Sequence, residues 1–330
     1  MEARLKVGRV YAGVRDRPVD REAEVRRVPA DQVPDVVVVG SASRDIATDD
    51  PRGWRLGGGA TYSSLALGRL GVRAGVLLGV DAEAATAWEL AMLRDVGVDV
   101  RTVPLSNGPV FENIEHDGVR RQRWLSRSDP VQVSALPDEW KAAPGWLLVP
   151  VAAEVPDDWA FVERPGTRVA IGWQGMLRRF RPDGWVERIE PRPSPLLAAA
   201  GLVCASVNDL PRTDRIAAVR ALGHGAALVL TDGAGGGFVV DERGRASTYP
   251  AIVADAVVDP TGAGDIFLAG LMAAWATTGE LLSGRSLRIA AAAGSLAVEG
   301  VGLAGAPDLA TLAVRARRVG AKADGGAGAG

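Results

Sequence analysis

Short apolar runs rich in β-branched residues alternate with helical stretches along most of this 330-residue chain. Continuous apolar runs of this length are typical of strands that are buried on both faces, as in parallel sheets. We therefore predict an α/β fold, in which a central, mostly parallel sheet is flanked by helices on both faces. The predicted strands are 36–40, 74–80, 146–151, 169–172, 202–206 and 227–231, and the predicted helices are 60–70, 81–96, 214–222, 263–275, 288–298 and 308–319.

The stretch 110–126 departs from this rhythm, because two partly alternating arms flank the dipeptide Asp117-Gly118. An Asp-Gly pair between alternating arms predicts a β-hairpin. A hairpin inserted in an α/β chain can serve as a small β lid over a site, or it can be a plain edge hairpin.

Composition excludes several classes of protein. The 38 Lys and Arg residues nearly balance the 40 Asp and Glu residues, so the net charge of −2 gives no reason to expect a nucleic-acid or membrane-surface partner. No apolar stretch reaches the roughly 18 residues that a membrane-spanning helix needs, and the charged N-terminal segment lacks the apolar core of a secretory signal. A single cysteine, Cys204, excludes an internal disulfide, and we expect a cytoplasmic protein.

Three regions divide the chain. Residues 1–34 are polar and without sustained periodicity, so whether they are ordered stays open. Residues 35–320 carry the α/β pattern as one domain, with lid elements at about 41–56 and 101–127. Residues 321–330 end in the low-complexity run ADGGAGAG, which predicts a disordered tail.

The segment from Asp259 to Asp265, DPTGAGD, stands directly before a predicted helix. Its glycines allow the backbone to approach a ligand closely, and the free N–H groups at a helix start favour an anion. A carboxylate beside such an anion hole is what phosphoryl transfer to an alcohol needs, because it can accept the hydroxyl proton. The alternative for Asp265 is a simple helix-capping role.

Two further glycine clusters open or follow predicted elements: one opens the helix predicted over 60–70, and the other follows the strand predicted over 227–231. The first is segment 57–71, GGGATYSSLALGRLG, and the second is segment 231–237, TDGAGGG. Consecutive glycines after a strand allow close backbone approach to phosphates, although the second cluster can also be a hairpin loop.

The segment from Asp259 to Asp265 closely resembles the DTTGAGD signature of the PfkB carbohydrate kinase family, the ribokinase-like kinases, with Pro260 as a common variation. Segment 57–71 is similar to the family's GG…N.A…..LG segment, and the resemblance extends over residues 36–312. It implies that Asp265 is the general base and that Gly262, Ala263 and Gly264 form the anion hole. It also implies that Gly57, Gly58 and Asp45 hold the hydroxyls of the acceptor.

The resemblance further implies a site for ATP and Mg²⁺. The family's T-x-G-x-x-G nucleotide loop matches Thr231, Gly233 and Gly236. Its N-x-x-E motif matches Ser206 and Asp209, where the carboxylate would act on Mg²⁺ through water. Many members also bind a monovalent cation such as K⁺, for which Asp259 and Thr261 are the matching positions, and whether that site functions here stays open.

One branch of the family, which includes inositol kinases, resembles this chain more closely than the ribokinases do. Tyr62 stands where ribokinases have Asn, and Gln174 and Arg178 match a D-x-Q-G-x-x-R segment whose Asp is Gly172 here. The resemblance thus makes Tyr62, Gln174 and Arg178 candidates for binding the substrate. For Gln174 and Arg178 the alternative is a buried Gln and a surface Arg without such a role. The resemblance therefore implies ATP-dependent phosphorylation of a small sugar or cyclitol such as inositol. A nucleoside kinase and a non-catalytic ligand-binding homologue are the alternatives, and a homodimer stays open.

Overall fold

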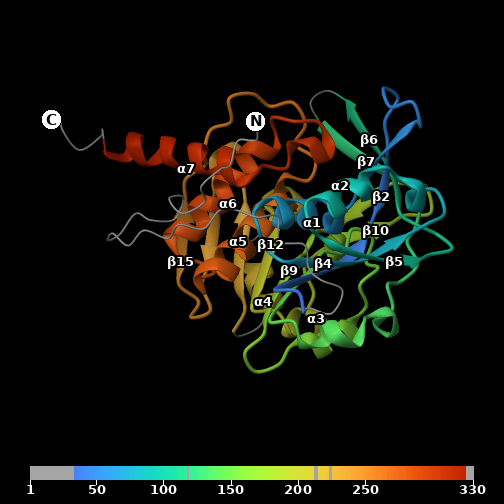
Figure 1. The fold of residues 1–330 in the computed structure, drawn as a ribbon, viewed down its shortest axis with the longest axis horizontal. Helices are drawn as coiled ribbons and strands as arrows, with labels where there is room; N and C mark the ends of the chain where they lie inside the picture. The colour runs from blue at the N-terminus through green and yellow to red at the C-terminus, as the bar shows by residue number, and fades with distance from the viewer. Residues whose placement is uncertain (1–32, 117–118, 212–214, 223–224, 325–330) are drawn as a thin grey trace, which may run out of the picture.

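The computed structural model describes residues 33–324, apart from 117–118, 212–214 and 223–224 (Figure 1). Almost all of the predicted N-terminal extension, residues 1–34, therefore lies outside the described residues, and so does 325–330 of the predicted tail. The C-terminal helix α7 (Leu309–Asp324) continues through 321–324, where the sequence predicts that a tail begins.

A nine-stranded sheet forms the centre of the domain, in the order β15-β14-β13-β12-β9-β8-β1-β4-β5. All neighbouring strands are parallel except at one edge, where β14 runs antiparallel to both β13 and β15, so the predicted mostly parallel sheet is confirmed. The strands are β1 (Val36–Ser41), β4 (Ala74–Val80), β5 (Asp99–Pro104), β8 (Gly145–Leu148), β9 (Arg168–Gly172), β12 (Leu202–Ser206), β13 (Ala227–Thr231), β14 (Gly237–Val240) and β15 (Ala246–Tyr249).

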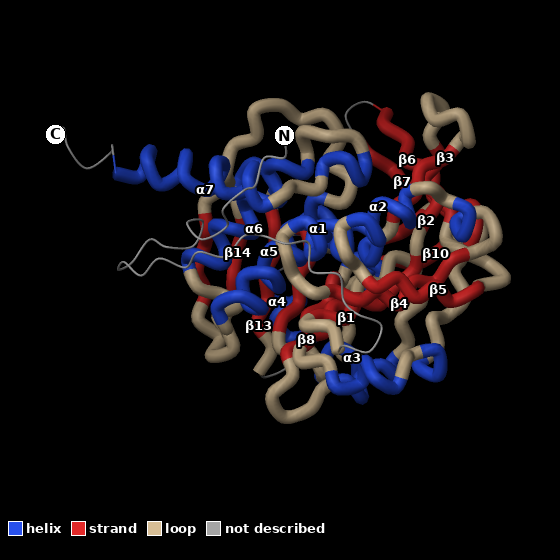
Figure 2. Tube along the Cα trace, viewed as in Figure 1, coloured by secondary structure: helices blue, strands red, loops and turns tan. Residues whose placement is uncertain are grey.

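Both faces of the sheet are covered, and β1 shows why its sequence is apolar throughout. Val36 and Val38 belong to one hydrophobic cluster, whereas Val37 and Val39 belong to the other. The first cluster packs against α1 (Gly59–Arg69), α2 (Glu89–Asp95), α5 (Ala263–Thr278), α6 (Gly284–Ala297) and α7. The second packs against α3 (Pro195–Ala198), α4 (Arg215–Leu222) and the 3₁₀ helices η4 (Asp138–Ala142) and η5 (Asp157–Val162), so α3 lies across the sheet from α1 in Figure 2.

The predicted lid is a separate four-stranded sheet in the order β3-β2-β6-β7, at the opposite end of the molecule from α7 (Figure 1). Its strands are β2 (Ser43–Ile46), β3 (Trp54–Gly57), β6 (Val110–His116) and β7 (Val119–Ser126). The antiparallel β6–β7 pair confirms the hairpin, whose Asp117-Gly118 turn lies outside the described residues. The lid segment 101–127 is wrong at its start, because 101–104 belongs to β5 and pairs with β4 in the large sheet.

Two further details differ from the sequence prediction. The single helix predicted over 81–96 is instead a 3₁₀ turn, η2 (Ala84–Thr86), followed by α2, because Ala87 between them is extended with ψ of 127°. A two-stranded ribbon of β10 (Arg178–Phe180) and β11 (Val186–Arg188) was not predicted at all. This ribbon reaches the lid through an antiparallel bridge between Arg123 and Trp185.

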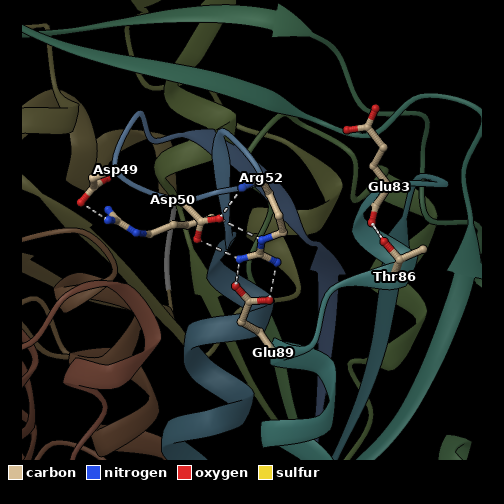
Figure 3. A network of polar contacts seen from close by, with 7 residues as sticks. Asp49, Asp50, Arg52, Glu83, Thr86 and Glu89 are labelled. Atoms are coloured by element: carbon tan, nitrogen blue, oxygen red, sulfur yellow. Dashed lines mark hydrogen bonds and ion pairs between the residues drawn. The ribbon is translucent and has the colours of Figure 1, made fainter.

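An ion-pair network connects the lid to α2 (Figure 3). Arg52, in the turn between β2 and β3, donates to both carboxylate oxygens of Glu89 at 2.5 and 2.8 Å. It also donates to Asp50 at 3.1 Å, and its guanidinium lies 4.5 Å from the ring centroid of Trp54. Because Glu89 is only 5% exposed, its charge depends on Arg52 for compensation.

We expect Arg52→Met to lower the free energy of unfolding by about 1–3 kcal/mol, because it leaves a buried carboxylate without its charged donor. Urea unfolding of the variant measures this loss. The double variant Arg52→Met/Glu89→Met should recover much of it, since no buried charge then remains. Equal stability of wild type and Arg52→Met would show that the network contributes nothing.

The strand order changes direction at β1, in the middle of the large sheet. From β1 the chain continues to β4 on one side, whereas β8 and the strands after it lie on the other side of β1. In open α/β sheets, ligands bind outside the carboxyl ends of the strands at such a change of direction. The carboxyl ends of β1 and β8 are therefore where a site is expected.

Candidate active site

Asp265 lies in the first turn of α5, which follows Gly262 in the left-handed conformation with φ of 78°. This turn is why the position requires glycine: a methyl group on Gly262 would overlap the ring of Tyr62. The first N–H groups of α5 have no partner within the helix, so together with the helix dipole they form a positive end that can hold an anion.

The N-terminus of a second helix, α1, lies next to the carboxylate of Asp265. Gly58 precedes α1 with φ of 97°, and a methyl group on the next residue, Gly59, would lie only 2.8 Å from Oδ1 of Asp265. The hydroxyl of Ser63 in α1 donates to the backbone oxygen of Asp265 at 3.3 Å. The first and last glycine clusters of the sequence are thus brought together around one carboxylate.

The surroundings of Asp265 raise the pKa of its carboxyl from 3.8 to about 7. Burial is the largest cause, the negative charge of Asp209 is the next, and Asp45 adds to both, whereas Arg178 opposes them. A carboxyl with a pKa near neutrality can accept a proton from a hydroxyl and release it again, which suits a general base.

Arg178, at the start of β10, lies among the carboxylates of the site. Burial lowers the pKa of its guanidinium, and the charges of Asp209, Asp265 and Asp45 raise it in that order. Its Nη1 donates to the backbone oxygen of Val151 at 3.0 Å. Arg178 is therefore a partly buried cation beside these carboxylates rather than a surface residue.

Asp45, in β2 of the lid, faces the other glycine pair. Its Oδ1 accepts a hydrogen bond from the hydroxyl of Ser43 at 3.0 Å, and its Oδ2 contacts the position where Gly57 would carry a side chain. The lid therefore contributes a carboxylate next to glycine backbone, an arrangement that can bind two hydroxyls of one ligand.

Ser206 and Asp209 form a reciprocal cap at the 3₁₀ helix η7 (Val207–Asp209). Asp209 Oδ2 accepts the N–H of Ser206 at 2.9 Å, and Ser206 Oγ accepts the N–H of Asn208 at 3.1 Å. The side-chain amide of Gln174 donates to Asp209 Oδ1 at 3.1 Å, so Gln174 holds this carboxylate. Spare lone pairs on Asp209 fit a Mg²⁺ ion whose remaining ligands are water and phosphate oxygens.

Tyr62 is only 3% exposed and packs beneath the turn at Gly262. In this position the ring supports the start of α5 from below. The structure therefore places Tyr62 next to the anion hole, which the family resemblance alone does not reveal.

The predicted nucleotide loop lies at the carboxyl end of β13. Gly233 and Gly236 have φ of 48° and 86°, both left-handed, and Thr231 Oγ1 lies 3.5 Å from the backbone oxygen of Ala205. A methyl group on Gly236 would overlap the backbone of Tyr249, so the loop is pressed against the end of β15.

Asp259 connects two segments near the start of α5. Its Oδ1 accepts the N–H of Thr261 and its Oδ2 accepts the N–H of Gly302, both at 2.9 Å. The carboxylate therefore connects the segment 259–265 to the loop after α6.

Within the described residues, no cluster of three His, Cys, Asp or Glu side chains is arranged to bind a metal ion. None of the described helices is long and apolar enough to span a membrane.

Sequence reasoning missed one buried carboxylate at this site, Glu154, which is 1% exposed. Its signal is weak, because a Glu in a loop of small residues has no motif. Gly172 stands where the resembled D-x-Q-G-x-x-R segment has Asp. A side chain at this position would be crowded, because its Cβ would lie 3.0 Å from Cγ1 of Val149.

Part of this chain is similar in sequence to known kinases. Residues 203–309 match the family described as pfkB family carbohydrate kinase. The inositol 3-kinase of Zea mays is 32% identical over 164 residues, which cover 48% of this chain and 41% of that protein. The chain therefore matches about two fifths of the length of this curated relative.

Solved structures with the same fold cover nearly the whole described chain. A pyrophosphate-dependent kinase in the ribokinase family, complexed with a pyrophosphate analogue and myo-inositol, aligns with a TM-score of 0.66 and 20% identity over 85% of this chain and 99% of that one. The fructokinase of Xylella fastidiosa with bound ATP aligns with a TM-score of 0.67 and 21% identity over 87% and 100%. The chain therefore contains a segment that matches the pfkB family of carbohydrate kinases, and it has a ribokinase-like fold.

Proposed function

We propose that this protein transfers the γ-phosphoryl group of ATP to a hydroxyl of a small sugar or cyclitol. The observation that carries this proposal is the carboxyl of Asp265, with a pKa of about 7, at the N-terminus of α5. Proton acceptor and anion hole are thus adjacent, as phosphoryl transfer to an alcohol requires.

Each residue has a defined task in this reaction. Asp45 and the backbone at Gly57 and Gly58 orient the acceptor hydroxyls. Asp265 accepts the proton of the attacking hydroxyl, and the N–H groups of Gly262, Ala263 and Gly264 stabilise the charge on the transferring phosphoryl oxygens. Arg178 donates to the acceptor hydroxyls opposite Asp45, and its charge balances the surrounding carboxylates.

The donor site is formed by the loop with Thr231, Gly233 and Gly236. Asp209, supported by Ser206 and Gln174, would hold Mg²⁺ through water, and the ion would supply positive charge against the donor phosphates. Asp259 and Thr261 are the candidate positions for K⁺.

A cyclitol is the favoured acceptor. The curated relative is an inositol 3-kinase, and one structural neighbour is complexed with myo-inositol. Asp45 and Arg178 offer an acceptor and a donor of hydrogen bonds to a polyhydroxylated ring. A nucleoside kinase is the second candidate, because a nucleoside kinase of Methanocaldococcus jannaschii has the same fold with a TM-score of 0.65.

A panel of donors and acceptors tests the proposal. ATP or pyrophosphate is combined with myo-inositol, ribose, fructose or adenosine, and the phosphorylated product is measured in each case. We expect transfer from ATP to a sugar or cyclitol. Transfer only from pyrophosphate would overturn the donor, and transfer only to adenosine would favour the nucleoside kinase. ATP binding without transfer to any acceptor would favour a non-catalytic homologue.

We expect kcat/KM for the acceptor to rise with pH and to level off above about pH 7, because Asp265 must be ionised to accept a proton. Below that pH the rate should fall about tenfold per pH unit. Initial rates across the range, with free Mg²⁺ held constant, measure the profile. A rising limb near pH 4, the usual range of an aspartate, would contradict the raised pKa.

A further inference from the structure

The carboxylate of Glu154 lies between the end of β1 and the segment that follows β8. Its Oε1 accepts the N–H groups of Ser41 at 3.0 Å and Val151 at 3.1 Å. Its Oε2 accepts those of Val151 at 3.0 Å and Ala152 at 2.7 Å. One side chain thus satisfies backbone donors at the end of β1 and in the segment after β8, which are more than a hundred residues apart in the sequence.

The strand order explains why these amides need a side-chain partner. Val149 still donates to Val39 across the β8–β1 pair at 3.0 Å. Beyond this bond the two segments separate. The segment after β1 continues into the lid and α1, whereas the segment after β8 continues towards η5 on the other face. A buried N–H without a partner is costly, and Glu154 supplies the acceptors at this point of divergence.

Each of the two strand ends leads directly to a group of the active site. Ser41 is followed by β2, which carries Asp45, and its backbone oxygen contacts the position where Gly58 would carry a side chain. Val151 accepts the hydrogen bond of Arg178 through its backbone oxygen at 3.0 Å. Glu154 therefore holds Ser41, from which the chain continues into the strand with Asp45. It also holds Val151, whose backbone oxygen accepts the hydrogen bond of Arg178.

The loop that contains Glu154 is held in an uncommon conformation. Ala153 has φ of 59°, a left-handed value that alanine rarely adopts and that costs free energy. This geometry turns the side chain of Glu154 back onto the amides of Val151 and Ala152. Burial raises the pKa of the Glu154 carboxyl, and its hydrogen bonds from backbone amides oppose that effect.

We propose that Glu154 is a positioning residue for the acceptor: by holding the ends of β1 and β8 together, it sets the distance between Asp45 and Arg178 across the bound polyol. This inference rests on the proposed function, in which those two side chains bind the acceptor. The donor loop after β13 and the anion hole at α5 receive no hydrogen bond from Glu154, so they should not depend on it.

The test compares Glu154→Gln with Asp308→Asn. The Gln variant keeps the size of the side chain but places an NH₂ group against backbone N–H groups. Asp308 is a matched control, because its carboxylate also accepts a backbone N–H, that of Thr311 at 2.8 Å, at the start of α7. KM for myo-inositol, KM for ATP, kcat and thermal stability are measured for both variants, and Glu154→Asp serves if Glu154→Gln does not fold.

We expect Glu154→Gln to raise KM for myo-inositol by about 10- to 100-fold, with KM for ATP unchanged, while Asp308→Asn changes neither. Unchanged KM for myo-inositol, or an equal rise of both KM values, would overturn the proposal. If the wild type transfers phosphate to no acceptor, the proposed function fails. The positioning role of Glu154 is then tested by backbone hydrogen exchange. Faster exchange of segments 43–46 and 178–180 in Glu154→Gln than in Asp308→Asn would support its positioning role, and equal exchange would overturn it.

Discussion

Asp265→Asn should lower kcat by about a hundred- to ten-thousandfold, because the amide cannot accept the proton of the attacking hydroxyl. The variant should still bind ATP, since the anion hole consists of backbone N–H groups that the substitution leaves in place. Steady-state kinetics measures the loss of turnover, and calorimetric titration with ATP measures binding.

The same variant should remain folded, which separates catalysis from stability. The pKa of Asp265 is raised in the folded protein, so the unfolded chain releases this proton at lower pH than the folded chain does. The free energy of unfolding therefore falls as the pH rises from about 4 to about 7. Asparagine does not ionise, so its variant does not lose free energy of unfolding in this way. Asp265→Asn should therefore be at least as stable as the wild type above pH 7. A variant with wild-type kcat would refute the general-base assignment.

Gly262→Ala should lower kcat by about a hundred- to a thousandfold, the cost of a displaced donor in an anion hole. Alanine is strained at φ of 78°, and its Cβ would overlap the ring of Tyr62, which is 3% exposed and cannot move into solvent. The turn must therefore shift, and the N–H groups that begin α5 shift with it. Kinetic constants for both substrates measure the effect.

Gly284→Ala is the matched control for this substitution. Gly284 also begins a helix, α6, but a methyl group there meets no atom within 4 Å. This variant should keep wild-type kinetics and stability. Wild-type turnover in Gly262→Ala, or an equal loss in both variants, would contradict the role of the Gly262 turn.

The parallel core and the signature segment were predictable from the sequence. The runs at β4, β12 and β13 are continuous and apolar because both of their faces are buried, so their bounds agree with the prediction. The start of α5 at Ala263 was predictable because only glycine suits the left-handed turn before it.

Other features depend on contacts that no local pattern records. The strand β5 lies at the edge of the sheet and is half exposed, so it lacks an apolar run. The ribbon of β10 and β11 has only three residues in each strand and is placed by its contact with the lid. Glu154 became visible only when the order of β8 and β1 was known, because its partners come from both strands.

Phosphorus NMR tests most directly whether Asp265 is the general base for phosphoryl transfer from ATP to a polyol hydroxyl. Wild type and Asp265→Asn are each observed with ATP, Mg²⁺ and myo-inositol. We expect a phosphomonoester signal that grows in step with ADP for the wild type and is nearly absent for the variant. A signal of equal rate from both proteins, or ADP release without any phosphomonoester, would contradict it.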